Sequence, residues 1–311
     1  MRILVLTLTF IIICQCKKEE PLAVDIPDYN FRRALIWKKV DANMDGILIR
    51  SEAEAVTSLD IDNFYIRDLT GIEAFINLKT LSCNENLLTN LDLSDNISLV
   101  SLECNENELN NLNITGNIKL ESLYCNGNHL TSLDLSNNPE LKSLTCYRNQ
   151  LGSLDLSNNF DLKILRTSVN HITTINLVNN SALEEFFCDN NQLTTLNISR
   201  NPFLRNFSCS RNKLTSLDIT KNTSLWAVNC QDNQLTGLDI SENLVVSNFS
   251  CSGNQFTSLD ISKNTSLEAL FIQDMPSLTK VCVWEMPFPP TGVKVNSEGS
   301  PNVYYTSDCN K

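Results

Sequence analysis

Five residues between positions 41 and 52 carry oxygen atoms at a spacing suited to a calcium ion. Asp41, Asn43 and Asp45 offer side-chain oxygens at every second position, Ile47 offers its backbone carbonyl, and Glu52 offers a carboxylate that can bind through both oxygens. Such an all-oxygen set suits a hard cation. The stretch matches D-x-[DN]-x-[DN]-G-x5-E at every specified position, so we predict a single structural Ca²⁺ site.

Two helical segments are needed to position this loop. Asp28 is a suitable N-cap for an entering helix that runs through Phe31 and Leu35 to Val40. The exit helix is expected from Ser51 to about Val56 and is short, because a strand-like segment follows it directly. A small helical cap therefore precedes the rest of the chain.

This helix–loop–helix pattern resembles an EF-hand. Gly46 stands where the loop turns sharply, and Leu48 stands where the loop is anchored in the core. The chain departs from the sensor type because it has no second EF-hand and its exit helix is stunted. The resemblance implies a structural Ca²⁺ site with an affinity of about 0.1–1 mM in a cap of residues 17–55. A metal-free acidic turn is the alternative.

Residues 1–16 are predicted to be a targeting segment, in which an apolar run from Ile3 to Ile13 follows Arg2 and is too short to span a bilayer. Cys14 and Cys16 close this run, and charged residues follow at once. The segment resembles the lipobox of bacterial lipoproteins, and Cys-Lys-Lys-Glu-Glu resembles the export signal of Bacteroidetes surface lipoproteins. The resemblance implies a lipid anchor at Cys16, with Cys14 as the second candidate, on a surface-exposed outer-membrane lipoprotein. Ordinary secretion without a lipid is the alternative.

Residues 78–266 are nine consecutive copies of the 21-residue pattern L-x-x-L-x-C-x-x-N-x-L-x-x-L-D-L-S-x-N-x-x. The copies begin at Leu78, Leu99, Leu120, Leu141, Leu162, Leu183, Leu204, Leu225 and Val246. Apolar and polar residues alternate in both halves of each unit, which predicts two short strands per coil and two parallel sheets. The nested pattern resembles the IRREKO type of leucine-rich repeat of bacterial surface and secreted proteins. It implies a mainly β, right-handed leucine-rich-repeat solenoid.

The repeated polar columns are predicted to be structural. Asn columns, from Asn86 to Asn254 and from Asn96 to Asn264, stand at the turns, where amides can satisfy backbone groups of neighbouring coils. Eight cysteines recur in one column, in which Thr167 fills the single gap; no CxxC pair or nearby histidine suggests zinc. Because stacked Cβ atoms are too far apart for disulfides, we expect buried free thiols. An outward Asp or Asn stripe, residues 92 to 260, is read as a solvated face; a cation-binding stripe is the alternative.

Both ends of the array are irregular. Residues 56–77 form a degenerate first repeat, and residues 267–311 form a last partial coil, a proline-containing stretch and a short extended tail. Cys282 and Cys309 lie outside the cysteine column. Two such cysteines in an exported cap suggest a disulfide, which would stabilise the tail by about 3–4 kcal/mol.

The sequence favours binding over catalysis. Its histidines, His129 and His171, stand two coils apart, and no nucleophile elbow, phosphate loop or HExxH pattern is present. A net charge of −12 argues against a nucleic-acid partner. We therefore expect no enzyme, but a monomeric module that binds a protein or polysaccharide and contacts the membrane only through its lipid. A structural envelope spacer without a specific ligand is the alternative.

Aromatic and arginine side chains on the outward positions are the candidate binding face, because such residues dominate binding hot spots. They follow an acidic first stretch. The candidates are Tyr124, Tyr147, Arg148, Arg166, Phe187, Arg205, Arg211 and Trp226. The alternative is ordinary variety on an exposed surface.

Overall fold

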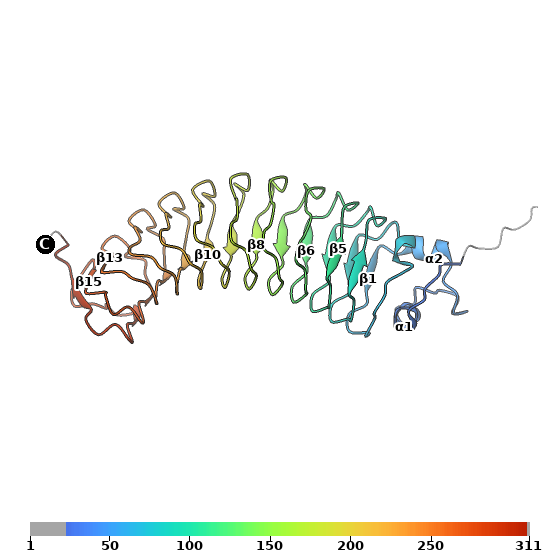
Figure 1. Ribbon diagram of the computed structural model, residues 1–311, viewed down its shortest axis with the longest axis horizontal. Coiled ribbons are helices and arrows are strands. Elements are labelled where there is room, and N and C mark those ends of the chain that lie inside the picture. Colours follow the sequence, from blue (N-terminus) through green and yellow to red (C-terminus); the bar gives the residue numbers. More distant parts are fainter. Residues whose placement is uncertain (1–22, 310–311) are drawn as a thin grey trace, which may run out of the picture.

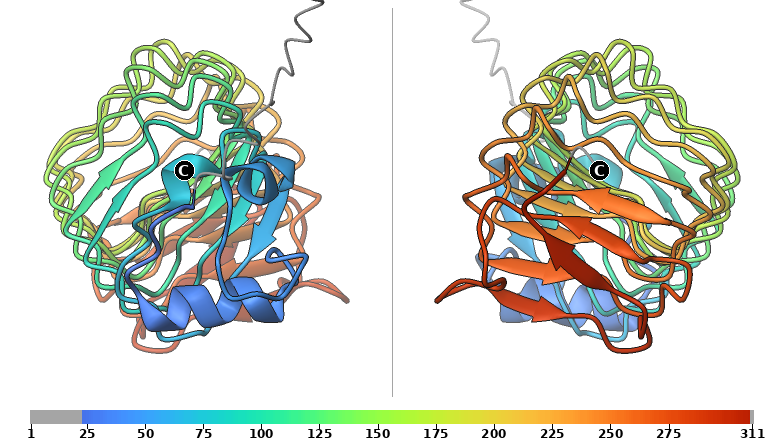
Figure 2. Two further views of the ribbon diagram at one scale, coloured as in Figure 1. Left: turned by 90° about the vertical axis from the view of Figure 1, so that its right-hand side faces the viewer. Right: turned by 90° about the vertical axis from the view of Figure 1, so that its left-hand side faces the viewer.

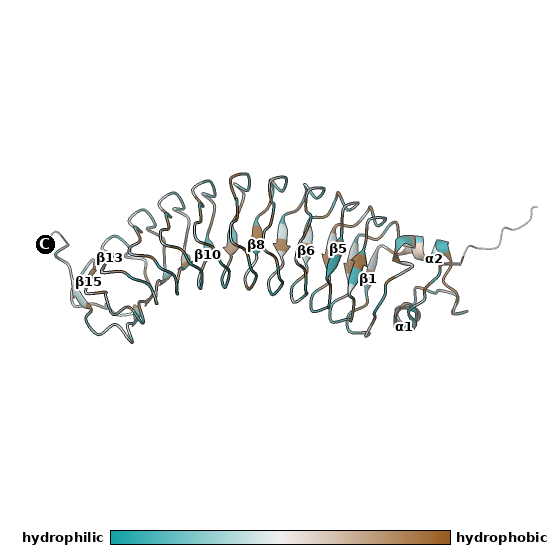
Figure 3. Cartoon of the chain, viewed as in Figure 1, coloured by the Kyte–Doolittle hydropathy of each residue, from teal (hydrophilic) through white to brown (hydrophobic). Residues whose placement is uncertain are grey.

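The computed structural model describes residues 23–309, which form an arched solenoid of stacked coils (Figure 1). Seen along its length, the coils lie one behind another (Figure 2), and their inward side chains form a single core. Polar and apolar residues alternate around every coil rather than separating along the array (Figure 3). The mainly β solenoid predicted from the sequence is therefore confirmed.

One parallel sheet of twelve strands runs the whole length of the array. Each strand has three residues, and in every strand except β16 (Lys294–Asn296) the central one is buried, as the alternating pattern predicts. Leu123, Leu144 and Leu165 pair in register, so the 21-residue repeat becomes a column. The strands are β1 (Ser58–Asp60), β2 (Thr80–Ser82), β4 (Ser101–Glu103), β6 (Ser122–Tyr124), β7 (Ser143–Thr145), β8 (Ile164–Arg166), β9 (Glu185–Phe187), β10 (Asn206–Ser208), β11 (Ala227–Asn229), β12 (Asn248–Ser250), β14 (Ala269–Phe271) and β16 (Lys294–Asn296).

The second half of the coil forms strands only near the two ends of the array, so the expectation of two strands in every coil was wrong. These strands are β3 (Asn90–Asp92) with β5 (Asn111–Asn113), and β13 (Ser258–Asp260), β15 (Lys280–Cys282) and β17 (Tyr304–Thr306). The coils fan out along an arc (Figure 1), so their spacing cannot be equal on all sides. Backbone bonding fixes the twelve-stranded side at about 4.8 Å per coil. The other side is left without a continuous ladder.

The C-terminal residues, expected to form a short extended tail, add a further coil. β16 pairs with β14, and β17 pairs with β15, so both sheets continue past the proline-containing stretch. The step along the chain from Leu270 to its partner Val295 is longer than the step from Phe249 to Leu270. Because this step is longer than 21 residues and the last coil lacks the Leu and Cys columns, the repeat pattern does not predict this coil.

The N-terminal cap contains α1 (Tyr29–Trp37) and α2 (Arg50–Ala55), and η1 (Ile72–Ala74) is a short 3-10 helix in the first coil. The Asp28 side chain accepts a hydrogen bond from the Phe31 backbone N–H at 2.8 Å, so α1 begins where its predicted N-cap stands. Phe31 and Leu35 are buried and belong to the same core as the coils. The cap thus closes the open end of the solenoid.

Candidate binding face, metal loop and buried columns

The loop between α1 and α2 is closed by its own acidic side chains. Gly46 N–H donates to Asp41 Oδ2 at 2.8 Å, and Ile47 N–H donates to Asp45 Oδ1 at 2.8 Å. Glu52 accepts from Ala42 N–H at 3.0 Å through one oxygen and from Ile49 N–H at 3.1 Å through the other. The side chains of Asp41, Asp45 and Glu52 therefore bond to backbone N–H groups of the same loop, and Glu52 links the two ends of that loop.

Asp41 differs from the other acids of this loop because it is almost fully buried, with 2% of its surface exposed, and its Oδ1 accepts no hydrogen bond. Gly46 has a φ of 82°, which favours glycine at the sharp turn. Leu48 is buried whereas Ile47 is exposed, as expected for an anchor beside a carbonyl ligand. Lone pairs on a buried carboxylate are costly unless a donor or cation meets them.

The acids of the loop are not drawn into a tight cluster. Within residues 23–309, the acidic and cysteine side chains that gather three ligand atoms within 4.8 Å of one another are instead those of Asp260, Cys282 and Cys309. Cys282 and Cys309 are joined by a disulfide with Cα atoms 5.5 Å apart, the pairing predicted for the tail. Their sulfurs are therefore not thiolate ligands.

The cysteine column is a row of buried free thiols, as predicted. Burial raises the pKa of Cys146 and of Cys230 to about 12 and also raises the pKa of every other thiol in the row. A protonated thiol is a poor nucleophile and metal ligand. The row comprises Cys83, Cys104, Cys125, Cys146, Cys188, Cys209, Cys230 and Cys251, and buried Thr167 fills the gap.

The first asparagine column joins each coil to the one before it. Asn149 Nδ2 donates to the carbonyls of Cys125 at 2.9 Å and Cys146 at 3.1 Å, and its Oδ1 accepts from Leu130 N–H at 3.0 Å. The same three bonds recur in the neighbouring coils, for example at Asn128. These amides satisfy backbone groups that the turn leaves free.

The second asparagine column is only half satisfied. Asn159 Nδ2 donates to the carbonyls of Leu135 at 3.3 Å and Asn138 at 2.9 Å, but its Oδ1 is buried without a partner. All nine members of this column share that unpartnered oxygen. The structural role predicted for both columns holds, but the two columns differ in how fully they bond.

The eight candidates for a binding face share one side of the solenoid but do not form one patch. Tyr124, Arg166 and Phe187 are outward residues of β6, β8 and β9. Arg205 and Trp226 precede strands β10 and β11. The remaining three follow the strands, at Tyr147, Arg148 and Arg211.

The arginines of this face are paired with acids of the same chain. Arg148 lies 3.1 Å from Glu106, Arg211 lies 3.4 Å from Asp232, and Arg205 lies 4.0 Å from Glu184. Arg166 pairs with Glu185 and also lies over the Phe187 ring, 5.5 Å from its centroid. The face is therefore not a field of free positive charge.

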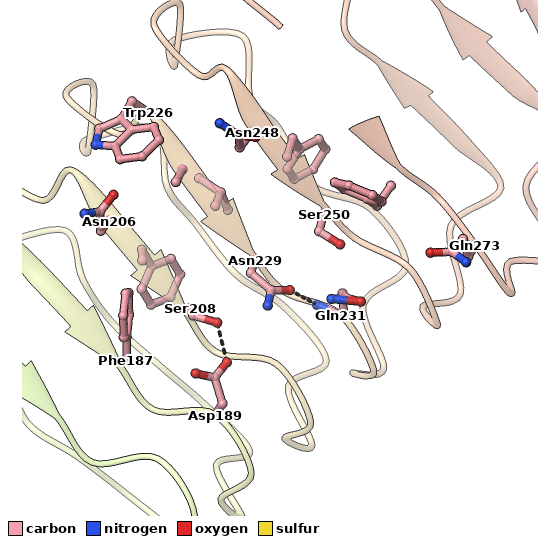
Figure 4. Close-up of a pocket in the computed structure, with 15 residues that line it drawn as sticks. Phe187, Asp189, Asn206, Ser208, Trp226, Asn229, Gln231, Asn248, Ser250 and Gln273 are labelled. Atoms are coloured by element: carbon pink, nitrogen blue, oxygen red, sulfur yellow. Dashed lines mark hydrogen bonds between the residues drawn. The ribbon is translucent and has the colours of Figure 1, made fainter. Parts of the chain in front are cut away.

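A groove of about 710 Å³ lies across β9 to β14 and includes Phe187 and Trp226 from the candidate set (Figure 4). One column of its floor runs Phe187, Ser208, Asn229, Ser250 and Phe271, which pair in register. Small polar residues thus lie between two phenyl rings. Figure 4 shows Phe187 and Trp226 on one side of the groove and Gln273 at its far end.

Solved structures with the same arrangement are leucine-rich-repeat proteins. InlJ from Listeria monocytogenes, whose functional domain includes a cysteine ladder, matches with a TM-score of 0.82 and 33% identity over 89% of this chain and 61% of that chain. The internalin InlF from Listeria monocytogenes matches with a TM-score of 0.70 and 17% identity over 95% of this chain and 100% of that one. This chain has a leucine-rich-repeat fold. It spans about three fifths of the length of the InlJ chain (61%).

A plant leucine-rich-repeat protein, the peptide hormone receptor RGFR1 in complex with RGF2, shares the fold with a TM-score of 0.62 and 17% identity over 83% of this chain and 52% of that one. No protein-family model matches the sequence, and no curated protein matches it either. Between residues 23 and 309, none of the helices has the length and apolar character that crossing a membrane requires.

The groove on the leucine-rich-repeat sheet was not found from the sequence. Ser208, Asn229 and Ser250 attract no attention singly, because serine and asparagine are common on exposed surfaces. The available signal was their run in one outward column, bounded by Phe187 one coil before it and by Phe271 one coil after it. A search for small residues between large ones in the same column finds it.

Proposed function

We propose that this protein is a non-catalytic binding module displayed on a bacterial cell surface, where it recognises a protein or polysaccharide. The observation that carries this proposal is the outer face of the twelve-stranded sheet. Its outward residues vary from coil to coil, and this rigid surface contains a groove. The complex of RGFR1 with RGF2 supports the capacity of this fold to hold a ligand. A binding role also agrees with the exposed histidines His129 and His171, which stand two coils apart.

Saturable binding tests this function. The labelled full chain, in detergent below its lytic concentration, is titrated onto intact bacterial and epithelial cells, and onto cells treated with protease or glycosidase. A binding module gives a saturable signal that one treatment abolishes. A structural spacer gives only a linear, non-saturable background signal that neither protease nor glycosidase removes. Its deletion causes an envelope defect instead.

We also propose that loop 41–52 holds one Ca²⁺ ion through Asp41, Asn43, Asp45, the Ile47 carbonyl and Glu52. The buried, unpartnered Oδ1 of Asp41 supports a cation at this place. A bound ion neutralises the carboxylates and ties α1 to α2, so these residues would stiffen the closed end of the solenoid.

Calorimetry and thermal unfolding with added CaCl₂ test this site. Saturation at a hundredfold excess over Kd would stabilise the chain by about 2.7 kcal/mol. Asp45→Ala should lose the calcium-dependent part of the melting temperature, whereas Asp62→Ala, outside the loop, should keep it. No heat of binding together with an unchanged melting temperature contradicts the site.

We propose that a lipid on Cys16 anchors the chain to the outer membrane, facing outward; Cys14 and Cys16 both lie outside the described residues. The motif at the apolar segment's end supports this. Mass spectrometry of the mature N-terminus is the test. Cys16→Ala should abolish acylation, whereas Cys14→Ala should leave it intact. The reverse result would assign the lipid to Cys14.

A further inference from the structure

We infer that the groove across β9 to β14 binds an uncharged stretch of oligosaccharide, an inference that rests on the proposed binding function. The site is built from two columns of outward residues on consecutive strands. Between Phe187 and Phe271 there are four strand steps, about 19 Å at 4.8 Å per step. The groove is therefore long and open, and its volume of about 710 Å³ lies within the ordinary range for ligand sites.

Three aromatic rings define the apolar part of the groove. Phe187 and Phe271 stand at its two ends, and Trp226, 44% exposed, stands beside the start of β11. A sugar ring presents a face of C–H groups with slight positive charge, which suits the negative face of an aromatic ring. The exposed rings of Trp226 and Phe271, beside a floor of small residues, leave room for such stacking, whereas the half-buried Phe187 ring closes the other end.

The lining of the groove within residues 23–309 has one charged side chain, and its carboxylate is hydrogen-bonded within the chain. Among the described residues that line it, Asp189 alone is charged, and this carboxylate accepts hydrogen bonds from Ser208, from Ser210 and from Ser168 Oγ at 3.1 Å. The nearest arginines are occupied by acids, as described for Arg166 and the rest of the face. An anionic ligand would meet the Asp189 carboxylate and no unpaired cationic side chain among these lining residues, so the chemistry favours a neutral saccharide over an acidic one.

The remaining polar groups can both donate and accept hydrogen bonds. Ser250 is 8% exposed, and its Oγ is buried without a hydrogen-bond partner. The Oδ1 atom of Asn206 is also buried without a partner. Asn229 uses its Oδ1 for the Gln231 backbone N–H at 3.2 Å and keeps its amide N–H groups for a ligand. Sugar hydroxyls donate and accept at once, so they satisfy this mixed set.

The strands beneath the groove offer nothing to the backbone of an extended peptide. β10, β11 and β12 are each hydrogen-bonded on both sides. A peptide usually joins a sheet at an open edge, where backbone groups provide affinity. Recognition here depends on side-chain amides, hydroxyls and rings, and this composition favours a saccharide over a peptide strand.

Fluorescence of Trp226 measures binding directly. The chain has three tryptophans, and Trp37→Phe with Trp284→Phe leaves Trp226 alone. The full chain, in a detergent without a sugar headgroup, is titrated with malto-, cello-, xylo-, manno- and chitohexaose. Oligogalacturonate and unstructured peptides of similar length are titrated in parallel. Concentrations up to about 5 mM reveal even millimolar binding.

Two variants and a matched control locate the ligand. Trp226→Ala should weaken binding at least about tenfold, measured by calorimetry because the reporter is gone. Ser250→Phe should abolish binding by filling the floor; it breaks no hydrogen bond of the serine side chain, and the column already carries phenylalanine at 187 and 271. Glu103→Phe introduces the same residue in that column outside the groove, and its Kd should stay within about twofold of the wild type.

The outcomes separate the groove from the wider function. Saturable binding of at least one neutral hexasaccharide that Ser250→Phe removes and Glu103→Phe retains supports the inference. The inference is overturned if no hexasaccharide binds in this way, or if only peptides or oligogalacturonate do. Saturable cell binding that survives Ser250→Phe would preserve the binding module while removing the saccharide groove.

Discussion

The first and second halves of each coil carry nearly the same sequence pattern but form different structures. The first half builds a twelve-stranded sheet, and the amides of its asparagine column use both their donor and their acceptor groups. The second half lacks strands through the middle coils, and its asparagine column leaves every Oδ1 unpartnered. The first half has cysteine where the second has leucine, and a variable outward residue where the second has aspartate. These small differences accompany the change from a side with a continuous strand ladder to a side without one.

The aspartate of the second half explains part of this difference. Asp155 Oδ1 accepts from the Ser157 backbone N–H at 2.9 Å, and Asp134 bonds Ser136 in the same way. Such local bonds satisfy a turn within its own coil. The first half adds a continuous backbone ladder between coils to the bonds of its asparagine column, so more of the cohesion of the array lies on that side. The proposed saccharide groove lies on that more rigid side.

The largest expected effect is a loss of stability in alkali that comes from the first half alone. Its thiols remain protonated when folded, with a pKa of about 12 at Cys146 and Cys230, whereas an unfolded thiol titrates near a pKa of about 8.5. The unfolded state therefore loses protons first, and stability falls as the pH rises from about 9 to 12. Each thiol contributes about 1.4 kcal/mol per pH unit, so the eight thiols together give a slope on the order of 10 kcal/mol per pH unit if the array unfolds as one. Urea midpoints with a phosphine reductant at pH 8, 9.5 and 10.5 measure this.

A double variant provides the control for that pH dependence. Cys146→Thr with Cys230→Thr should reduce the slope by about 3 kcal/mol per pH unit, and Thr167 shows that the column accepts threonine. Equal slopes for the wild type and this variant would show that the thiols do not control alkaline unfolding.

The second prediction compares the two asparagine columns. Asn149→Ala removes three hydrogen bonds and orphans three buried backbone groups, so we expect a loss of about 4 kcal/mol. Asn159→Ala removes two bonds but also an oxygen that was buried without a partner, so we expect about 2 kcal/mol. Urea unfolding at pH 7 measures both. Exposed Asn158→Ala is the control and should stay within about 0.5 kcal/mol; an equal cost in the two columns contradicts the comparison.

Sequence reasoning succeeded where one residue type has one physical role. It predicted the N-cap at Asp28, the buried thiol column and the disulfide between Cys282 and Cys309. It failed for the second-half strands because Leu91-Asp92 lies in β3 whereas the matching Leu133-Asp134 is in no strand. Coil spacing decides that difference, and no local pattern encodes coil spacing.

The binding face was predicted less completely, for a similar reason. The arginines looked available in the sequence, yet Arg148 pairs with Glu106 two coils away. Pairing at a separation of 42 residues becomes evident only when the register is known. The groove likewise depends on the small size of Ser208 and Ser250 relative to their neighbours in the column, which is a property of several coils together.

The smallest expected effect tests the local bonds of the second half at Asp155. Asp155→Asn should change the melting temperature at pH 7 by less than about 2 °C, because Asn176 and Asn197 accept the same turn bond in their coils. The backbone N–H and hydroxyl of Ser157 lower the pKa of Asp155, so its contribution is present above about pH 4 and is lost as the pH falls through the lowered folded value. The asparagine variant should therefore lose less stability than the wild type between about pH 5 and pH 2.5. Calorimetric scans over that range measure the difference, with the exposed acid variant Asp161→Asn for comparison. If Asp155→Asn is as sensitive to acid as the wild type, the turn bond does not stabilise the folded carboxylate, and the open side of the coil is held by its asparagine column and apolar packing without help from the aspartates.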